Sequence, residues 1–205
     1  MIPWLGWAFQ IRPADIDESR LPGEAPGAYV LRLAEEKARA AGKLASEGML
    51  VVAADTTVAD GDDLLGKPAS ASEARVMLRQ LRGRSHQVYT AVAVLDPARN
   101  RLLHDLCATQ VPMRRYSEDE IEAYIASGDP FDKAGGYAIQ HAQFHPVEDL
   151  RGCYASVMGL PLCHLTRTLR KLGIHPPADS AQVCQSNLNY SCSIYTAVLA
   201  GQTAG

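Results

Sequence analysis

Asp55 is the acidic residue whose place in the sequence most suggests chemistry. It follows the apolar run of residues 49–54, and such a run is typical of a strand buried on both faces. Ligands of open α/β sheets collect in the crevice beyond the strand ends, where a carboxylate can hold a divalent cation or accept a proton from water. A turn aspartate that caps the following backbone fits the same spacing equally well.

Lys67 stands twelve positions after Asp55 and is fixed between Gly66 and Pro68. A lysine held rigidly near an aspartate suits a phosphate that lies beside a metal ion. Taken alone, a solvated turn lysine is the simpler interpretation, because isolated lysines are usually exposed.

A third candidate is the segment 132–137, Asp-Lys-Ala-Gly-Gly-Tyr, which leads to Gln140. Two consecutive glycines allow the backbone to approach a ligand and to present amide N–H groups, and Lys133 adds positive charge. Gln140, expected at the end of a short strand, carries a donor and an acceptor that can recognise the edge of a base. The alternative is a β-turn with a structural glycine pair. Glu18 and Lys37 complete the set, although their local sequence resembles that of any solvated charge.

Helical patterns that alternate with buried strands predict an α/β domain with a mixed sheet to position these side chains. Apolar spacing, caps and Gly or Pro boundaries predict helices over residues 26–46, 70–83, 117–128 and 161–173. Strands are predicted over residues 49–54, 86–95 and 102–113, the last two paired across a turn. We expect one domain over residues 1–177 and an irregular tail over residues 178–205, because the chain carries no charged residue after Asp179.

The overall composition and charge exclude some classes of binding partner and some kinds of site. A net charge of −3 argues against broad binding to nucleic acid. Since no apolar run approaches the roughly 20 residues that span a bilayer, we expect a cytoplasmic protein without a membrane partner. Five cysteines without a CxxC pair fit neither a disulfide framework nor a zinc knuckle. Three of them are expected to be small core residues in a reducing compartment: Cys107, Cys153 and Cys163.

Several ordered blocks of the sequence resemble the Maf-like family of nucleoside triphosphate pyrophosphatases. The resemblance runs from about residue 5 to residue 173. Its main blocks are Leu33-Ala34 with Lys37-Ala38, Ala54-Asp55-Thr56, Gly66-Lys67-Pro68, Val88-Tyr89-Thr90, residues 132–140 and residues 157–162.

The resemblance implies metal-dependent hydrolysis of a nucleoside triphosphate between its α- and β-phosphates, with Mg²⁺ or Mn²⁺ as cofactor. It also implies an elongated mixed sheet flanked by helices, as in inosine triphosphatase, and a homodimer. Asp55 would be the catalytic acid or base and, with Glu18, a metal ligand. Phosphate binding would fall to Lys37, Lys67 and Lys133, and base selection to Thr56 and Gln140, in the manner of the branch that prefers dTTP and UTP.

One departure concerns the start of the chain. Family members usually begin with a strand and a Ser-x-Ser-Pro-Arg-Arg loop that holds phosphates, and Met1 falls just after that point. We therefore expect the first strand of the family sheet to be missing, so that residues 1–177 form an N-terminally truncated domain. An active pyrophosphatase, a nucleotide-binding regulatory module with weak or no turnover, and a poorly folding fragment are the three interpretations.

Overall fold

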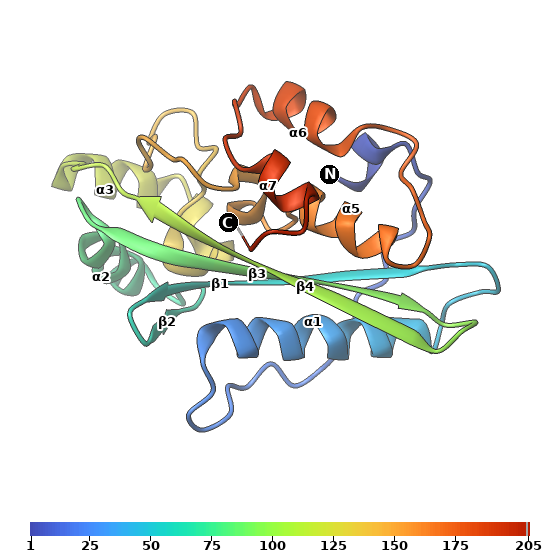
Figure 1. The fold of residues 1–205 in the computed structure, drawn as a ribbon. Helices are drawn as coiled ribbons and strands as arrows, with labels where there is room; N and C mark the ends of the chain where they lie inside the picture. The colour runs from blue at the N-terminus through green and yellow to red at the C-terminus, as the bar shows by residue number, and fades with distance from the viewer. Residues whose placement is uncertain (204) are drawn as a thin grey trace.

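The computed structural model describes residues 1–203 and 205, and one four-stranded sheet forms its framework (Figure 1). All three strand pairings are antiparallel. The α/β class and the elongated sheet flanked by helices are as the sequence predicts. The predicted sheet is mixed, however, and no two of the described strands pair in parallel. The order is β2-β1-β3-β4, with β1 at Val51–Asp60, β2 at Asp63–Leu65, β3 at Ser85–Asp96 and β4 at Arg101–Pro112.

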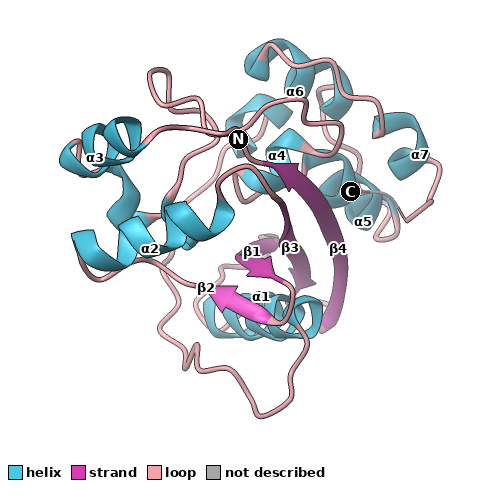
Figure 2. Ribbon diagram, turned by 90° about the vertical axis from the view of Figure 1, so that its left-hand side faces the viewer, coloured by secondary structure: helices cyan, strands magenta, loops and turns pink. Residues whose placement is uncertain are grey.

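Helices cover both faces of the sheet and one of its ends (Figures 1 and 2). One face carries α1 (Pro26–Gly42), and the opposite face carries α4 (Tyr154–Val157) and α5 (Leu162–Arg170). Two further helices, α6 (Ser180–Leu188) and α7 (Tyr195–Leu199), pack against α5. At one end lie α2 (Ala71–Leu81) and α3 (Glu118–Ala126), and short 3₁₀ helices occupy Ile2–Leu5, Asp129–Asp132 and Ala134–Gly136.

Small side chains allow α1 to lie close to the sheet. Pro26 begins the helix, where the missing N–H has no acceptor to lose. Buried Ala34 and Ala38 pack in one cluster with Ala91 and Ala93 of β3. This close contact holds the polar side of α1 next to β1, which is what positions the site.

The spacings Ser70-x-x-Glu73 and Ser117-x-x-Glu120 predict a capping box at the start of both α2 and α3. Only the second forms completely, because Glu73 accepts instead from the backbone N–H of Ala69 (2.8 Å). Ser70 Oγ accepts a hydrogen bond from the backbone N–H of Glu73 (3.2 Å). Ser117 and Glu120 form a complete capping box, in which each side chain accepts from the other residue's backbone N–H. Such caps satisfy helix N–H groups that have no partner within the helix.

The expectation of an irregular tail over residues 178–205 is wrong, because this segment contains α6 and α7. Asp179 caps α6, accepting from the backbone N–H groups of Ala181 (2.9 Å) and Gln182 (3.0 Å). Ala181 and Val198 are buried in one cluster with Cys163 of α5. Tertiary packing supplies most helical stability in proteins, so the weak periodicity of the tail concealed its helices.

The strand expected before Gln140 is also absent. In its place, the backbone N–H of His141 donates to the carbonyl of Ala138 (3.1 Å), and Gln140 lies in the resulting turn.

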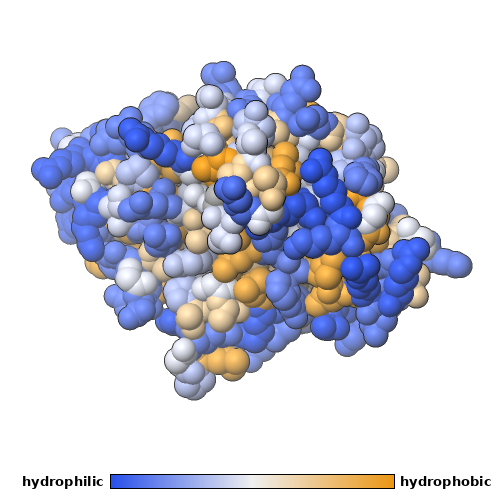
Figure 3. Space-filling view, in the orientation of Figure 1, coloured by the Kyte–Doolittle hydropathy of each residue, from blue (hydrophilic) through white to orange (hydrophobic). Residues whose placement is uncertain are grey.

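The outer surface is mainly hydrophilic on the face drawn in Figure 3, where apolar residues form several separate patches. Exposed large apolar side chains include Phe9, Ile11 and Leu44, and scattered examples of this kind are normal in folded proteins. Among the described helices, none has the length and apolar character needed to cross a membrane.

Alternation along β1 separates neighbouring residues of the site. Asp55 is in register with Ala91, which packs against α1, and Thr56 is in register with Thr90, whose hydroxyl contacts α4. Because successive side chains of a strand point to opposite faces, Asp55 belongs to the α1 face and Thr56 to the α4 face.

Candidate active site

Lys37 joins the two carboxylates that the sequence predicts as metal ligands. Its ammonium nitrogen is 2.5 Å from Asp55 Oδ1 and 2.7 Å from Glu18 Oε1. Glu18 lies on the extended segment before α1, which Tyr29 holds by donating its hydroxyl proton to the Glu18 carbonyl (2.8 Å). The Asp55 side chain is 11% exposed and that of Glu18 is 57% exposed, so the triad runs from the interior to solvent.

The surroundings of this triad change its acid–base properties. Burial raises the pKa of Asp55, the hydrogen bond and charge of Lys37 act against this rise, and the charge of Glu18 adds to it. For Lys37, burial alone would lower the pKa, but hydrogen bonds with Asp55 and Glu18 outweigh it, so the pKa is raised. Both shifts coexist because one ammonium serves two carboxylates and Asp55 is the more buried of them. Lys37 thus stays charged while Asp55 accepts a proton more readily than an exposed aspartate.

Lys67 lies on the exposed loop after β2, and its charge lowers the pKa of Asp55. This loop is tied to the glycine pair, because the backbone N–H of Gly135 donates to the Gly66 carbonyl (3.0 Å). Gly135 has a φ of +71°, and a Cβ at this position would lie 3.0–3.2 Å from side-chain atoms of Val58. Both the backbone conformation and the close approach to β1 therefore require glycine.

Lys133 makes local ion pairs. Its ammonium contacts the carboxylate of Asp132 and lies 3.3 Å from both the backbone carbonyl and Oδ1 of Asp129. Tyr124 donates to the other carboxylate oxygen of Asp129 (2.7 Å). These contacts hold the loop, and the use of Lys133 as a phosphate ligand stays a prediction.

Thr56 contacts the α4 side of the sheet through a chain of hydrogen bonds. Its Oγ1 is 2.9 Å from Thr90 Oγ1, and Thr90 donates to the carbonyl of Ser156 in α4 (2.8 Å). Since a hydroxyl has one proton to donate, Thr56 must be the donor to Thr90. The lone pairs of Thr56 Oγ1 are therefore available to accept a hydrogen bond from a ligand.

Gln140, the other predicted base-reading residue, is exposed in its turn. Tyr154 of α4 donates its hydroxyl proton to the carbonyl of the preceding residue, Ile139 (3.4 Å). The short helix α4 therefore contacts the neighbours of both Thr56 and Gln140. This helix thus links the surroundings of Thr56 and Gln140, and Thr56 lies on the opposite face of β1 from Asp55.

An open pocket of about 560 Å³ adjoins the triad. Thr57 of this pocket points to the same face of β1 as Asp55, and Gly66 directly precedes Lys67. The volume falls in the range of about 300–1,000 Å³ that is usual for small-molecule sites. Its lining residues are Arg20, Tyr29, Thr57, Asp63, Leu64, Leu65 and Gly66.

Of these seven lining residues only Gly66 belongs to a predicted motif, and Arg20, Tyr29 and Thr57 are among the six that were not predicted. The two-residue period of a strand places Thr57 on the Asp55 face, and Tyr29 precedes Lys37 by two steps of four residues along α1, so both could have been found. Arg20 carries no such signal. It donates to the carbonyls of Glu24 (2.8 Å) and Asp62 (3.1 Å), bridging the segment before α1 to the β1–β2 turn.

Comparison with known families agrees with the resemblance seen in the motifs. A family profile described as "Maf-like protein" matches residues 3–172, which is most of the chain. The chain belongs to the Maf-like family. The Glu18–Lys37–Asp55 triad, Lys67 and Gln140 of this Maf-like chain all fall within the matched residues.

Individual relatives are similar over nearly the same length. A protein of Anaeromyxobacter dehalogenans (strain 2CP-1 / ATCC BAA-258) is 47% identical over 179 residues, covering 86% of this chain and 90% of its own. One from Citrifermentans bemidjiense is 45% identical over 82% of this chain and 86% of its own. One from Desulforamulus reducens is 41% identical over 83% of this chain and 88% of its own. Each of the three is named dTTP/UTP pyrophosphatase.

Proposed function

We propose that this chain hydrolyses nucleoside triphosphates, with dTTP and UTP preferred, to a nucleoside monophosphate and pyrophosphate. The observation that carries the proposal is the Lys37 ammonium, held between Glu18 and Asp55 next to a pocket of about 560 Å³. The names of the 41–47% identical relatives support the same activity here.

Positive charge at the pocket would bind the phosphates. A triphosphate carries about four negative charges, which such enzymes offset with fixed cations. Lys37 has three N–H donors, so its two carboxylate partners leave one for a phosphate oxygen. Lys67 on its exposed loop and Arg20 in the pocket wall supply further positive charge.

Asp55 would take the proton of the attacking water. The oxygen of this water forms a bond to phosphorus at the α–β linkage, and the phosphoanhydride bond breaks with its electron pair on the leaving phosphate oxygen. Burial favours the protonated carboxyl, so accepting this proton costs Asp55 less than it would cost an exposed aspartate. Lys37 holds the carboxylate in place and balances its charge before the transfer.

The carboxylates of Asp55 and Glu18 fit a divalent cation such as Mg²⁺ or Mn²⁺. Both are hard oxygen donors of the kind that these ions prefer. Since both oxygens contact the same ammonium at 2.5 and 2.7 Å, they are no more than about 5 Å apart and need only a small shift to share one ion. When bound, such an ion polarises phosphoryl oxygens and adds positive charge.

The α4 side of the sheet would select the base. Because Thr56 donates its hydroxyl proton to Thr90, its Oγ1 can only accept a hydrogen bond from a ligand. This suits the imide N–H group that uracil and thymine offer and cytosine lacks. Gln140 could donate and accept at the base edge. These two residues together would favour dTTP and UTP.

The test is product analysis with the purified chain. We expect dTTP and UTP, with Mg²⁺ or Mn²⁺, to give the monophosphate and pyrophosphate, separated by ion-exchange chromatography and identified by ³¹P NMR. Release of orthophosphate and a diphosphate would place the cut at the wrong bond. Tight nucleotide binding without turnover would instead favour the regulatory module.

A further inference from the structure

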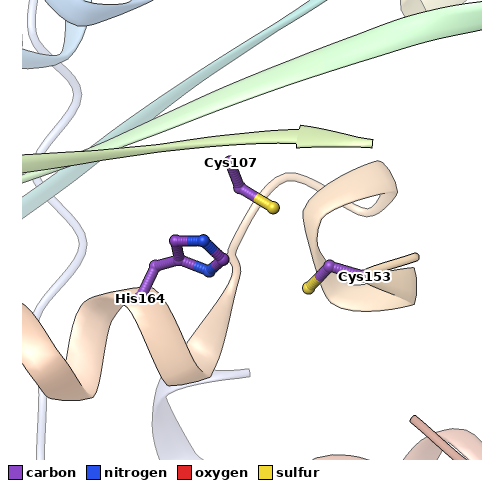
Figure 4. Close-up of side chains that lie close together, drawn as sticks. All are labelled: Cys107, Cys153 and His164. Carbon is purple, nitrogen blue, oxygen red and sulfur yellow. The ribbon is translucent and has the colours of Figure 1, made fainter. Parts of the chain in front are cut away.

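Three metal-ligating side chains converge on the face of the sheet opposite Asp55. Cys107 comes from β4, Cys153 directly precedes α4, and His164 lies on α5. One ligand atom from each of the three lies within 4.8 Å of the other two, and all three residues are buried. Figure 4 shows the two thiols and the imidazole ring directed toward a common space.

We propose that Cys107, Cys153 and His164 form a zinc site. Its position is independent of the proposed hydrolysis, because none of the three residues belongs to the Asp55 triad or to the pocket beside it. The residues are 46 and 11 positions apart in the sequence, so their spacing gives no zinc-knuckle pattern and only the fold brings them together.

The ligand atoms are spaced closely enough for one zinc ion. With Zn–S bonds of about 2.3 Å and Zn–N bonds of about 2.0–2.1 Å, tetrahedral ligand atoms lie roughly 3.5–3.8 Å apart. The observed limit of 4.8 Å requires a contraction of at most about 1.3 Å at the longest edge, which side-chain rotation can supply.

Charge balance also favours zinc at this buried position. Two thiolates neutralise the 2+ charge of the ion, and the imidazole binds in its neutral form. The resulting site carries no net charge, so the interior does not have to hold an uncompensated ion. Sulfur and imidazole ligands suit zinc, whereas Mg²⁺ and Mn²⁺ prefer the oxygen donors of Glu18 and Asp55.

A small cavity adjoins two of the proposed ligands. It measures about 20 Å³ and is bordered by Cys153 and His164, together with residues of α6 and α7. The volume is enough for one water molecule, and a water bound to the metal here would be the fourth ligand of a tetrahedral zinc ion. Cys184 and Cys192 border the same cavity but do not belong to the close group of ligand atoms, so we assign them no bond to the metal.

The ion would fasten α4 to the sheet. Cys107 is in register with Thr90, which in turn donates to the Ser156 carbonyl of α4. A bond from the metal to Cys153, just before α4, would anchor this helix on a second side. We therefore expect a structural role, seen as increased thermal stability of the zinc-loaded chain.

Cobalt and zinc titrations of the full chain test the proposal. The protein is reduced with a non-thiol reductant and stripped with a chelator. We expect a thiolate-to-cobalt charge-transfer band in the near ultraviolet that corresponds to about one thiolate-bound Co²⁺ per chain, its displacement by Zn²⁺, and a higher Tm with Zn²⁺. Absence of the charge-transfer band in folded wild-type protein would overturn the proposal without any variant.

Matched variants identify the ligands. C107S, C153S and H164Q should each weaken zinc binding by more than about 100-fold. This exceeds the loss of about 10–100-fold in affinity that is typical of residues that contact a metal ligand and not the metal. C184S and C192S should bind as the wild type does, and so should D55N, which removes the oxygen site. Unchanged binding in a folded C107S/C153S double variant, or loss in C184S or C192S, would contradict this ligand set. A mass decrease showing a Cys107–Cys153 disulfide that persists under reduction would also exclude it.

Discussion

The two faces of the sheet hold clusters of opposite character in neighbouring rows. Asp55 is in register with Ala91 and Leu106, and the next row holds Thr56, Thr90 and Cys107. On the first face, a lysine and two carboxylates reach from the interior to solvent, and on the second, two thiols and an imidazole are buried beneath helices. Neighbouring residues of one strand therefore contribute to two different sites. One is open and charged, so that a substrate can enter and leave, and the other is closed, with permanent contacts.

This contrast explains why the two clusters have different supports. The open face depends on ion pairing, because Lys37 holds Glu18 and Asp55 from α1. The closed face depends on packing, since the tail helices α6 and α7 cover α5, which carries His164. Substitutions in the Glu18–Lys37–Asp55 triad should change turnover with little effect on stability, and substitutions in the buried cluster of Cys107, Cys153 and His164 should do the reverse.

Asp55→Asn is the strongest test of the open face. Asn keeps the shape but accepts a proton poorly and binds cations weakly, so we expect kcat/KM for dTTP to fall by about 10²–10⁴-fold with the Tm nearly unchanged. The matched control is D60N, because Asp60 lies on the same strand, has a side chain 12% exposed and pairs with Arg84. Equal activity of D55N and D60N would reduce Asp55 to a structural role.

His86 lies four residues before Thr90 on β3, hence on the same face of the sheet, and offers a stability test of the closed face. Burial lowers its pKa to about 4, below the value of about 6.5 in an unfolded chain. Between pH 4 and 6.5 the imidazole of His86 is therefore protonated in the unfolded chain but not in the folded one. The folded state is not penalised by this difference above pH 6.5, where the imidazole is neutral in both states. Stability is lost progressively as the pH falls toward 4, by up to about 3 kcal/mol.

Urea unfolding at pH 7, 6 and 5 measures this effect. His86→Phe should flatten the loss of unfolding free energy with falling pH, although it removes the 2.8 Å hydrogen bond to Tyr137 and lowers stability at every pH. The control is H175F at an exposed position, which should keep the wild-type slope. An unchanged slope in H86F would show that other groups cause the pH dependence.

The sequence was a good guide where local signals decide the structure. Ser70 and Ser117 cap their helices as predicted, and the pairing of β3 with β4 follows from two strongly β-prone segments. The tail helices were missed because burial against α5 stabilises them and their own periodicity is weak.

The same distinction applies to the site. Asp55 was recognisable from its strand, and the family motifs led to Lys37 and Glu18, but only tertiary structure brings these three together. The cluster of Cys107, Cys153 and His164 could not have been predicted, because three separate elements supply its members. The expectation that these cysteines are buried is confirmed.

Lys37→Gln and Glu18→Gln should move the pH profile of the open face in opposite directions. The charges that act on Asp55 are those of Lys37, Glu18 and Lys67. Removing Lys37 raises the pKa of Asp55, so the acid limb of kcat/KM moves to higher pH. Removing Glu18 lowers that pKa, so the limb moves to lower pH.

Steady-state kinetics over pH 4.5–8 measures both shifts. K37Q should also lose about 10–100-fold in kcat/KM at neutral pH, because it removes one charge-assisted bond to phosphate. K43Q, at the exposed end of α1, is the control for general loss of charge. Shifts of the same sign in K37Q and E18Q would disprove the assignment of the limb to Asp55.

Gln140→Ala should have the smallest effect, and it tests whether base selection is separate from catalysis. If Gln140 hydrogen-bonds the base edge, its loss removes an interaction worth about 0.5–1.5 kcal/mol for the preferred nucleotides alone. The ratio of kcat/KM for dTTP to that for a purine nucleotide should then fall by roughly 2- to 13-fold, with the acid limb unchanged because Asp55 is untouched. Gln143→Ala is a close control, since Gln143 is an exposed glutamine three residues further along the chain. A uniform drop for all nucleotides in Q140A would assign Gln140 to phosphate binding or loop structure. An altered acid limb would mean that the two faces act on each other through β1.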